Sequence, residues 1–145
     1  MAVPHSGRPA RILLVEDSVA DAKLFGMALE ENGSTSEVLR VEDAAEALAY
    51  LEAAESGDLP RPDLVVLDLN LPRAGGLEVL RRIRSEPALR TVPVVVFSTS
   101  RADVDVSAAY ALGASSYVVK PLDLHRFMAV VRSIEDYWTA VVRLP

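Results

Sequence analysis

Five residues of this chain have side chains suited to binding a divalent cation and a phosphoryl group. They lie far apart in the sequence, yet all stand at the ends of apolar runs: Glu16, Asp17, Asp68, Ser98 and Lys120. Clustered carboxylates raise one another's pKa unless a cation shares their site, and carboxylate oxygens favour Mg²⁺ or Mn²⁺. A lysine and a hydroxyl would contact phosphoryl oxygens, and Asp68 would be the nucleophile that forms an aspartyl phosphate. The pattern therefore predicts phosphoryl-group chemistry with a bound metal ion.

Each of these residues taken alone also has a structural explanation. The acid pair could cap the following helix, Asp68 could cap its loop, Ser98 could form a turn, and Lys120 could be a surface lysine. Chance gives no reason for four strand ends to carry this set together, so we favour a shared site. Asn70 is the weakest member, because its backbone carbonyl could reach the metal but an asparagine in a tight loop needs no function.

Side chains this far apart in sequence meet only if strands carry them to one edge of a sheet. Five segments rich in apolar residues predict such strands: 11–15, 35–41, 64–67, 91–97 and 115–119. The unalternated runs among them are typical of strands covered on both faces. Helices are expected to start at Ser18, at Asp43 and at Ser100 with Asp103, and a long amphipathic helix follows Leu122. This alternation predicts an α/β fold, a doubly wound five-stranded parallel sheet in a single domain.

Composition narrows the class of protein. The chain has 145 residues, a net charge of −6 and no cysteine. The acidic charge argues against nucleic-acid binding, and the lack of cysteine excludes disulfides and thiolate metal sites. No apolar stretch reaches spanning length, so we expect a cytoplasmic protein without membrane contact. We divide the chain into a flexible arm (1–10), a folded domain (11–136) and a C-terminal extension of the last helix (137–145).

Four motifs resemble the receiver domain of two-component response regulators: Ile12 to Ser18, Val66 to Pro72, Phe97 to Thr99 and Val119 to Pro121. The resemblance covers roughly residues 10 to 136. It implies a flavodoxin-like sheet with strand order 2-1-3-4-5. It also implies that Asp68 accepts a phosphoryl group from a histidine of a sensor kinase. The remaining roles that it implies are Mg²⁺ binding by Glu16, Asp17, Asp68 and the Asn70 carbonyl, and phosphoryl binding by Ser98 and Lys120.

The resemblance further implies how a signal leaves this site. Ser98 would move toward the phosphoryl group, and Tyr117, at the switch-aromatic position of the family, would turn inward. The alternative is that Tyr117 is a static, half-buried strand residue, since aromatic residues suit strands. The peptide bond before Pro121 is expected to be cis. Thr99 stands where many receivers have Ala or Gly, and its larger side chain could narrow access to the phosphoryl group.

The chain is more closely similar to the single-domain regulators paired with bacterial phytochromes. The similarity rests on Asp21, Leu69 to Pro72, Ser98 to Ser100 and above all the tail, Tyr137 to Pro145. It implies a bacteriophytochrome as the kinase partner, with a receiver from another kinase pathway as the alternative. The tail supplies further apolar residues, and these either fold back over the domain or form a homodimer interface. The similarity favours the homodimer, with contacts through Tyr137, Trp138, Val141 and Val142.

Two other functions compete with a phospho-accepting switch. An aspartate-nucleophile phosphatase also uses a strand-end Asp with Mg²⁺, but it generally needs a second acid two residues later, where this chain has Asn70. We therefore expect no enzyme acting on outside substrates, only self-phosphotransfer and self-dephosphorylation. A phosphorylation-independent interaction module is disfavoured because no residue of the predicted site is missing.

Overall fold

The computed structural model describes residues 8–72 and 75–141, and its core is a single parallel sheet. The strands lie in the order β2-β1-β3-β4-β5, which confirms the predicted fold class and strand order. Their bounds are β1 (Arg11–Val15), β2 (Glu37–Val41), β3 (Leu64–Leu67), β4 (Val94–Ser98) and β5 (Ser116–Val119). The helices are α1 (Val19–Glu31), α2 (Ala44–Glu55), α3 (Gly75–Ser85), α4 (Asp103–Ala111) and α5 (Leu124–Asp136), the last continued by a π-helical turn, η2 (Tyr137–Val141).

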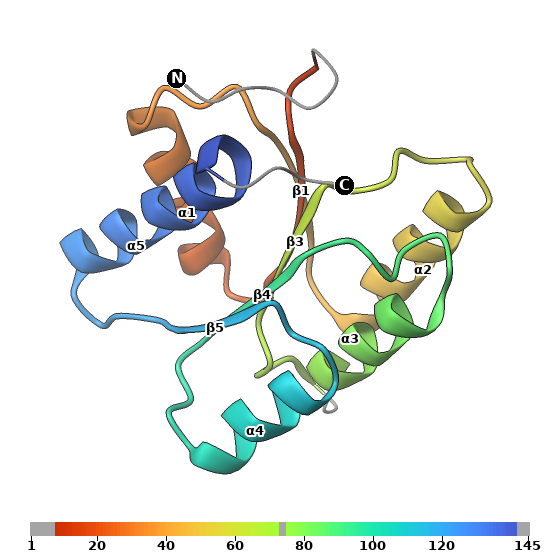
Figure 1. The fold of residues 1–145 in the computed structure, drawn as a ribbon. Helices are drawn as coiled ribbons and strands as arrows, with labels where there is room; N and C mark the ends of the chain where they lie inside the picture. Colours follow the sequence, from red (N-terminus) through yellow and green to blue (C-terminus); the bar gives the residue numbers. More distant parts are fainter. Residues whose placement is uncertain (1–7, 73–74, 142–145) are drawn as a thin grey trace.

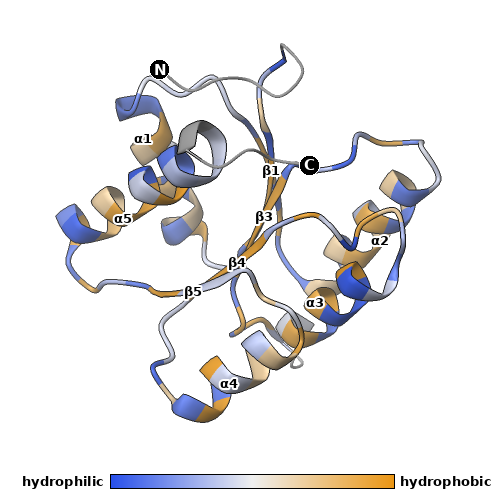
Figure 2. Ribbon diagram, viewed as in Figure 1, coloured by the Kyte–Doolittle hydropathy of each residue, from blue (hydrophilic) through white to orange (hydrophobic). Residues whose placement is uncertain are grey.

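The helices cover both faces of the sheet. Figure 1 shows α1 and α5 together on one face and α2, α3 and α4 on the other. The central strand β3 is therefore apolar and buried along its whole length, and it is orange in Figure 2. Along β1, Leu13 and Val15 join the core beneath α2 and α3, whereas Ile12 and Leu14 join the core beneath α1 and α5. Burying a side chain of this size contributes about 1.5–3 kcal/mol, so the two cores hold the strand ends in place.

Two of the predicted helix starts are confirmed. Ser18 accepts a hydrogen bond from the Asp21 N–H at the start of α1, and Asp43 accepts one from Glu46 at the start of α2. Such caps are worth about 1 kcal/mol each because they pair backbone donors that the helix leaves free. Asp123 caps α5 in the same way, although the sequence analysis did not single it out.

Of the two residues predicted to start α4, Asp103 is confirmed and Ser100 is wrong. The helix begins at Asp103, its N-cap is Ala102, and no side chain caps it. The Ser100 hydroxyl instead bonds the carboxylate of Asp105, inside the helix, so this serine closes the loop from β4 rather than the helix end.

The predicted flexible arm over residues 1–10 is also corrected at its end. Arg8 pairs with Asp63 through two hydrogen bonds of 2.7 and 2.9 Å. Ala10 is buried, and its carbonyl accepts the Glu37 N–H at 2.8 Å. Residues 8–10 therefore belong to the folded domain, and the rest of the predicted arm lies outside the described residues.

The chain stays helical after α5 ends at Asp136 and continues into η2. The carboxylate of Glu135 is buried and accepts hydrogen bonds from Asn32, Ser34 and Ser36 in the segment between α1 and β2. These bonds tie the end of α5 to the start of β2.

In the part of the chain that the structure describes, no helix is both long enough and apolar enough to cross a bilayer.

Candidate functional site

The ammonium of Lys120 is the centre of the predicted site. Its Nζ atom lies 2.6 Å from Glu16 Oε1, 3.0 Å from Asp68 Oδ2 and 2.9 Å from Asp21 Oδ2. An ammonium has three N–H donors, so each of them meets a carboxylate. Lys120, Glu16 and Asp68 are all buried. The structure thus brings together residues that lie up to 104 positions apart in the sequence.

The backbone of the sheet holds these side chains in place. The Glu16 N–H bonds the Val41 carbonyl at 3.0 Å, and the Asp68 N–H bonds the Val15 carbonyl at 3.0 Å. The Lys120 N–H bonds the Ser98 carbonyl at 2.7 Å. Each bond extends a strand ladder by one residue beyond the regular strand. The site residues therefore leave the sheet with their backbone still paired to a neighbour.

The site holds more acid than base. Burial, with a smaller contribution from the nearby charge of Asp68, raises the pKa of Glu16 to about 7 against the opposing hydrogen bond and charge of Lys120. Burial alone would lower the pKa of Lys120, but hydrogen bonds to Asp21 and Glu16 and the charges of Glu16 and Asp68 outweigh it, so the pKa is raised. Lys120 stays charged, and one lysine does not fully neutralise the carboxylates around it.

Three carboxylates are placed to hold a divalent cation. One oxygen from each of Glu16, Asp17 and Asp68 lies within 4.8 Å of the others. Glu16 and Asp68 are buried, whereas Asp17 is exposed and leaves the site open to water on one side. Mg²⁺ binds few carboxylates and keeps several waters, so this donor set fits Mg²⁺ or Mn²⁺.

The side chain of Asn70 has a role that the sequence did not indicate. Its Nδ2 atom donates to Ser98 Oγ and to Thr99 Oγ1, both at 3.1 Å, while its N–H donates to Asp68 Oδ1 at 2.9 Å. Asn70 therefore links the loop after β3 to the end of β4. The predicted use of its carbonyl as a metal ligand stays a prediction.

Ser98 and Tyr117 lie in one network with the loop between β4 and α4. Ser98 is completely buried, and its Oγ accepts the Ser100 N–H at 3.4 Å. Tyr117 is half-buried, and its hydroxyl donates to the Ser100 carbonyl at 2.9 Å. Its backbone N–H donates to the hydroxyl of Tyr110 at 3.0 Å. Tyr117 is therefore hydrogen-bonded to the loop that follows Ser98.

The expected cis bond before Pro121 is contradicted. No peptide bond between described residues is cis, so Lys120 and Pro121 are joined in the trans form. Trans is the lower-energy form of an isolated X–Pro bond by about 0.5–1 kcal/mol. The trans bond still leaves Lys120 in contact with all three of its carboxylate partners.

Two residues near the site were missed as functional candidates. Asp21 was noted for its position at the start of α1, but its contact with Lys120 was not foreseen. Its local sequence gave no signal of this contact, which depends on how α1 packs against the end of β5. Arg40 of β2 bonds the carbonyls of Glu16 and Asp17, and nothing in its local sequence indicated that contact.

Of the four predicted interface residues of the tail, Tyr137 and Trp138 have side chains that the structure describes. Trp138 packs partly against the core beneath α1 and α5, and its ring meets that of Tyr137 edge to face at 5.2 Å. Tyr137 itself is 52% exposed. The Val141 side chain and all of Val142 lie outside the described residues. The structure therefore gives Trp138 contacts within its own domain and leaves Tyr137 on the surface.

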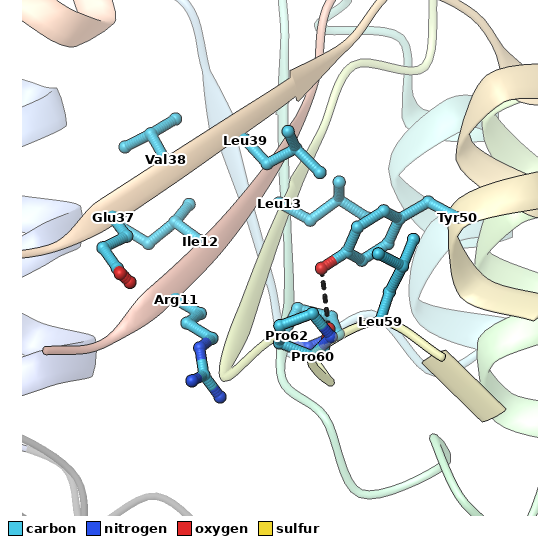
Figure 3. Close-up of a pocket in the computed structure, with 10 residues that line it drawn as sticks. All are labelled: Arg11, Ile12, Leu13, Glu37, Val38, Leu39, Tyr50, Leu59, Pro60 and Pro62. Carbon is cyan, nitrogen blue, oxygen red and sulfur yellow. Dashed lines mark hydrogen bonds between the residues drawn. The ribbon is translucent and has the colours of Figure 1, made fainter. Parts of the chain in front are cut away.

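A separate pocket of about 300 Å³ lies at the other end of the sheet (Figure 3). It is lined mainly by apolar side chains from the starts of β1 and β2, from α2 and from the loop before β3. The Tyr50 hydroxyl, which borders it, donates to the Pro60 carbonyl at 2.7 Å. Arg11 and Glu37 are the charged residues of its lining. The pocket thus lacks the clustered carboxylates of the site at the carboxyl ends of the strands.

The fold and the site together define a class of protein: a doubly wound sheet with an acid cluster, a hydroxyl and a lysine at the carboxyl ends of its strands. The protein-family model of the response regulator receiver domain matches residues 12–132 of the sequence. The chain belongs to the response regulator receiver domain family, the signalling proteins of two-component systems.

Relatives of known sequence and structure agree with this assignment. Response regulator Rcp1 of Synechocystis sp. is 40% identical, with 97% of each chain covered. The probable methanogenesis regulatory protein FilR2 of Methanothrix harundinacea is 41% identical, over 94% of this chain and 88% of that one. The crystal structure of the phosphorylated cyanobacterial phytochrome response regulator RcpA matches with a TM-score of 0.89 at 41% identity, covering 94% of this chain and 99% of that one. The Mn²⁺-bound form of Rcp1 matches with a TM-score of 0.86 at 41% identity and the same coverage.

Proposed function

We propose that Asp68 accepts a phosphoryl group from a histidine of a sensor kinase. The observation that carries this proposal is the position of the Asp68 carboxylate, which lies 3.0 Å from Lys120 Nζ and beside the carboxylates of Glu16 and Asp17. A carboxylate oxygen of Asp68 forms a bond to phosphorus as the bond from phosphorus to the imidazole nitrogen breaks. The imidazole leaves with that electron pair, so the reaction needs no further reactant.

The residues around Asp68 each support one part of this transfer. Lys120 balances the charge of the phosphoryl oxygens. Ser98 accepts hydrogen bonds from Asn70 and Ser100, and no described residue accepts its hydroxyl proton, so it has a donor to offer to a phosphoryl oxygen. A Mg²⁺ or Mn²⁺ ion held by Glu16, Asp17 and Asp68, with the Asn70 carbonyl, would neutralise charge on the same oxygens.

We place the protein among switches rather than among enzymes that turn over outside substrates. The residue two positions after Asp68 is Asn70, whose amide donates to Ser98 and Thr99 and cannot supply a proton as an acid would. Loss of the phosphoryl group would then occur by self-dephosphorylation. Thr99, held by Asn70 near the site, narrows the approach of water.

The partner that we propose is a bacteriophytochrome-type sensor kinase in the cytoplasm. Its support is the similarity to Rcp1 and to RcpA, a phytochrome response regulator. A kinase of another pathway is the alternative, and phosphotransfer from purified kinases in red and far-red light would separate the two. A light-dependent transfer to Asp68 supports the phytochrome assignment.

We also propose that the protein forms a homodimer through the surface of η2. Tyr137 is 52% exposed there, and the helical chain continues past the end of α5. Exposed aromatic residues are typical anchors of protein interfaces. Trp138, Val141 and Val142 are the other proposed contacts.

One experiment tests the phosphorylation site and the dimer together. Mass spectrometry and light scattering are applied to the wild type, to Asp68→Asn and to the control Asp58→Asn, whose residue lies on an exposed loop. Acetyl phosphate serves as the donor, with and without Mg²⁺. We expect one added phosphoryl group in the wild type and the control, only with Mg²⁺, and none in Asp68→Asn. A phosphoryl group on Asp68→Asn would refute the assignment of Asp68, and a monomer in every condition would refute the dimer.

A further inference from the structure

Arg40 holds the loop that carries two of the three carboxylates proposed to bind the metal. It lies on the edge strand β2, in register with Leu14 of β1, one residue before β1 ends. Its Nε atom donates to the Glu16 carbonyl at 3.0 Å, and its Nη2 atom donates to the Asp17 carbonyl at 3.2 Å. Its Nη1 atom lies 3.3 Å from Glu42 Oε1. One planar guanidinium thus spans both ligand residues and is itself held by a carboxylate.

These two bonds restrain the backbone where the sheet stops restraining it. Among the described residues, the hydrogen bond from the Glu16 N–H to the Val41 carbonyl is the last ladder bond between β1 and β2. Beyond it the chain turns toward α1, and Asp17 is exposed. A shift of this turn would move both carboxylates relative to Asp68. Mg²⁺ requires near-ideal octahedral geometry with oxygens at about 2.0–2.1 Å, so small shifts of a ligand weaken its binding.

We propose that Arg40 is a positioning residue for the divalent-cation site, acting through the backbone of Glu16 and Asp17. The inference rests on the proposed function of that site. The guanidinium is positive, so its charge alone opposes a bound cation. Its favourable effect is therefore geometric. A lysine keeps the charge but not the fixed fork that reaches two carbonyls at once.

The chain offers a matched control for this role. Arg84 of α3 also holds backbone carbonyls with its guanidinium, those of Gly113 at 2.8 Å and Val92 at 2.6 Å. It makes no contact with the ligand residues in the described part of the chain. Arg84→Lys therefore removes the same kind of interaction from a place where only stability depends on it.

The test measures the binding of Mn²⁺ alone. The electron paramagnetic resonance signal of the free ion reports how much Mn²⁺ remains unbound. Wild type, Arg40→Lys, Arg40→Met and Arg84→Lys are compared at a temperature well below their thermal midpoints, which circular dichroism supplies. Loss of contacts around metal ligands typically weakens binding 10- to 100-fold, and we expect about a 10-fold loss in Arg40→Lys. Arg40→Met should also bind more weakly, although it lacks the repelling charge. Arg84→Lys should melt earlier and bind Mn²⁺ as the wild type does.

The outcomes separate this inference from the proposed function. Wild-type affinity in Arg40→Lys, or tighter binding in Arg40→Met, would overturn the positioning role, because either shows that only charge matters. Equal weakening in Arg84→Lys would overturn it too, since general loss of stability would then explain the effect. If Arg40→Lys does not fold, weaker binding by Arg40→Met supports the role and unchanged binding refutes it. A wild type that binds no Mn²⁺ would instead refute the metal site itself, and this inference with it.

Discussion

Replacing Lys120 by methionine should destabilise the metal-free protein far more than the loss of an ordinary surface lysine. The lysine side chain is 4% exposed, and the side chains of its partners Glu16 and Asp68 are 4% and 6% exposed. Removing one partner of such a buried pair costs about 3–5 kcal/mol, because the remaining charge is left without compensation. Glu16 already has a pKa of about 7 and can take up a proton, so we expect the lower end of this range.

Urea unfolding with a chelator present measures this loss. With a denaturant slope of about 2 kcal/mol/M, a loss of about 3 kcal/mol lowers the urea midpoint by about 1.5 M. The chain's other lysine, Lys23, is exposed on α1 and provides the control, and Lys23→Met should change the midpoint little. Adding Mg²⁺ should restore much of the loss in Lys120→Met, since a cation again balances Glu16 and Asp68. A midpoint as high as that of Lys23→Met, or a loss that Mg²⁺ leaves unchanged, would refute this account of the site.

Two further predictions concern residues that support the site and the last helix. In Gly76→Ala the new Cβ would lie 2.6 Å from the Leu69 Cα and 2.9 Å from the Asp68 carbonyl oxygen, so phosphorylation by acetyl phosphate should slow and the thermal midpoint fall. Gly26→Ala, with no atom within 4 Å of the new Cβ, should instead stabilise α1 by about 0.5–1 kcal/mol. Glu135→Ala leaves Ser34 and Ser36 without their carboxylate acceptor and Asn32 with Asp136 alone, so it should cost about 1–3 kcal/mol in urea unfolding. An alanine at the exposed Glu30 should cost little, and equal midpoints would contradict the anchoring role.

The site residues at the strand ends could be predicted because the carboxyl ends of all strands in a parallel sheet lie at the same edge. Once apolar runs are assigned to strands of one direction, Asp68, Ser98 and Lys120 must lie at the same edge. The apolar runs are a strong signal because both faces of the sheet are covered by helices. Fold class and strand-end residues therefore follow from patterns that are local in the sequence.

The contacts of Arg40, Asp21 and Arg8 could not be predicted in the same way. Each depends on which residues of two distant segments lie opposite one another. Arg40 reaches the Glu16 carbonyl only because β2 pairs with β1 in the register that places it beside Leu14. A shift of one residue would turn its side chain to the other face of the sheet. The position of Ala102 rather than Ser100 at the start of α4 likewise depends on a loop contact, the bond from Ser100 to Asp105.

The hydrogen bonds around Ser98 indicate how a phosphoryl group on Asp68 would change contacts outside the site. Lys120 keeps two carboxylate partners if its bond to Asp68 is exchanged for one to a phosphoryl oxygen, so it need move little. Ser98 differs, because a hydroxyl that turns toward the phosphoryl group changes the geometry of the bonds it accepts from Asn70 and Ser100. The Ser100 carbonyl in turn holds the hydroxyl of Tyr117. The hydroxyl and the tyrosine are thus joined through one loop residue, and a shift of that residue changes the support of both.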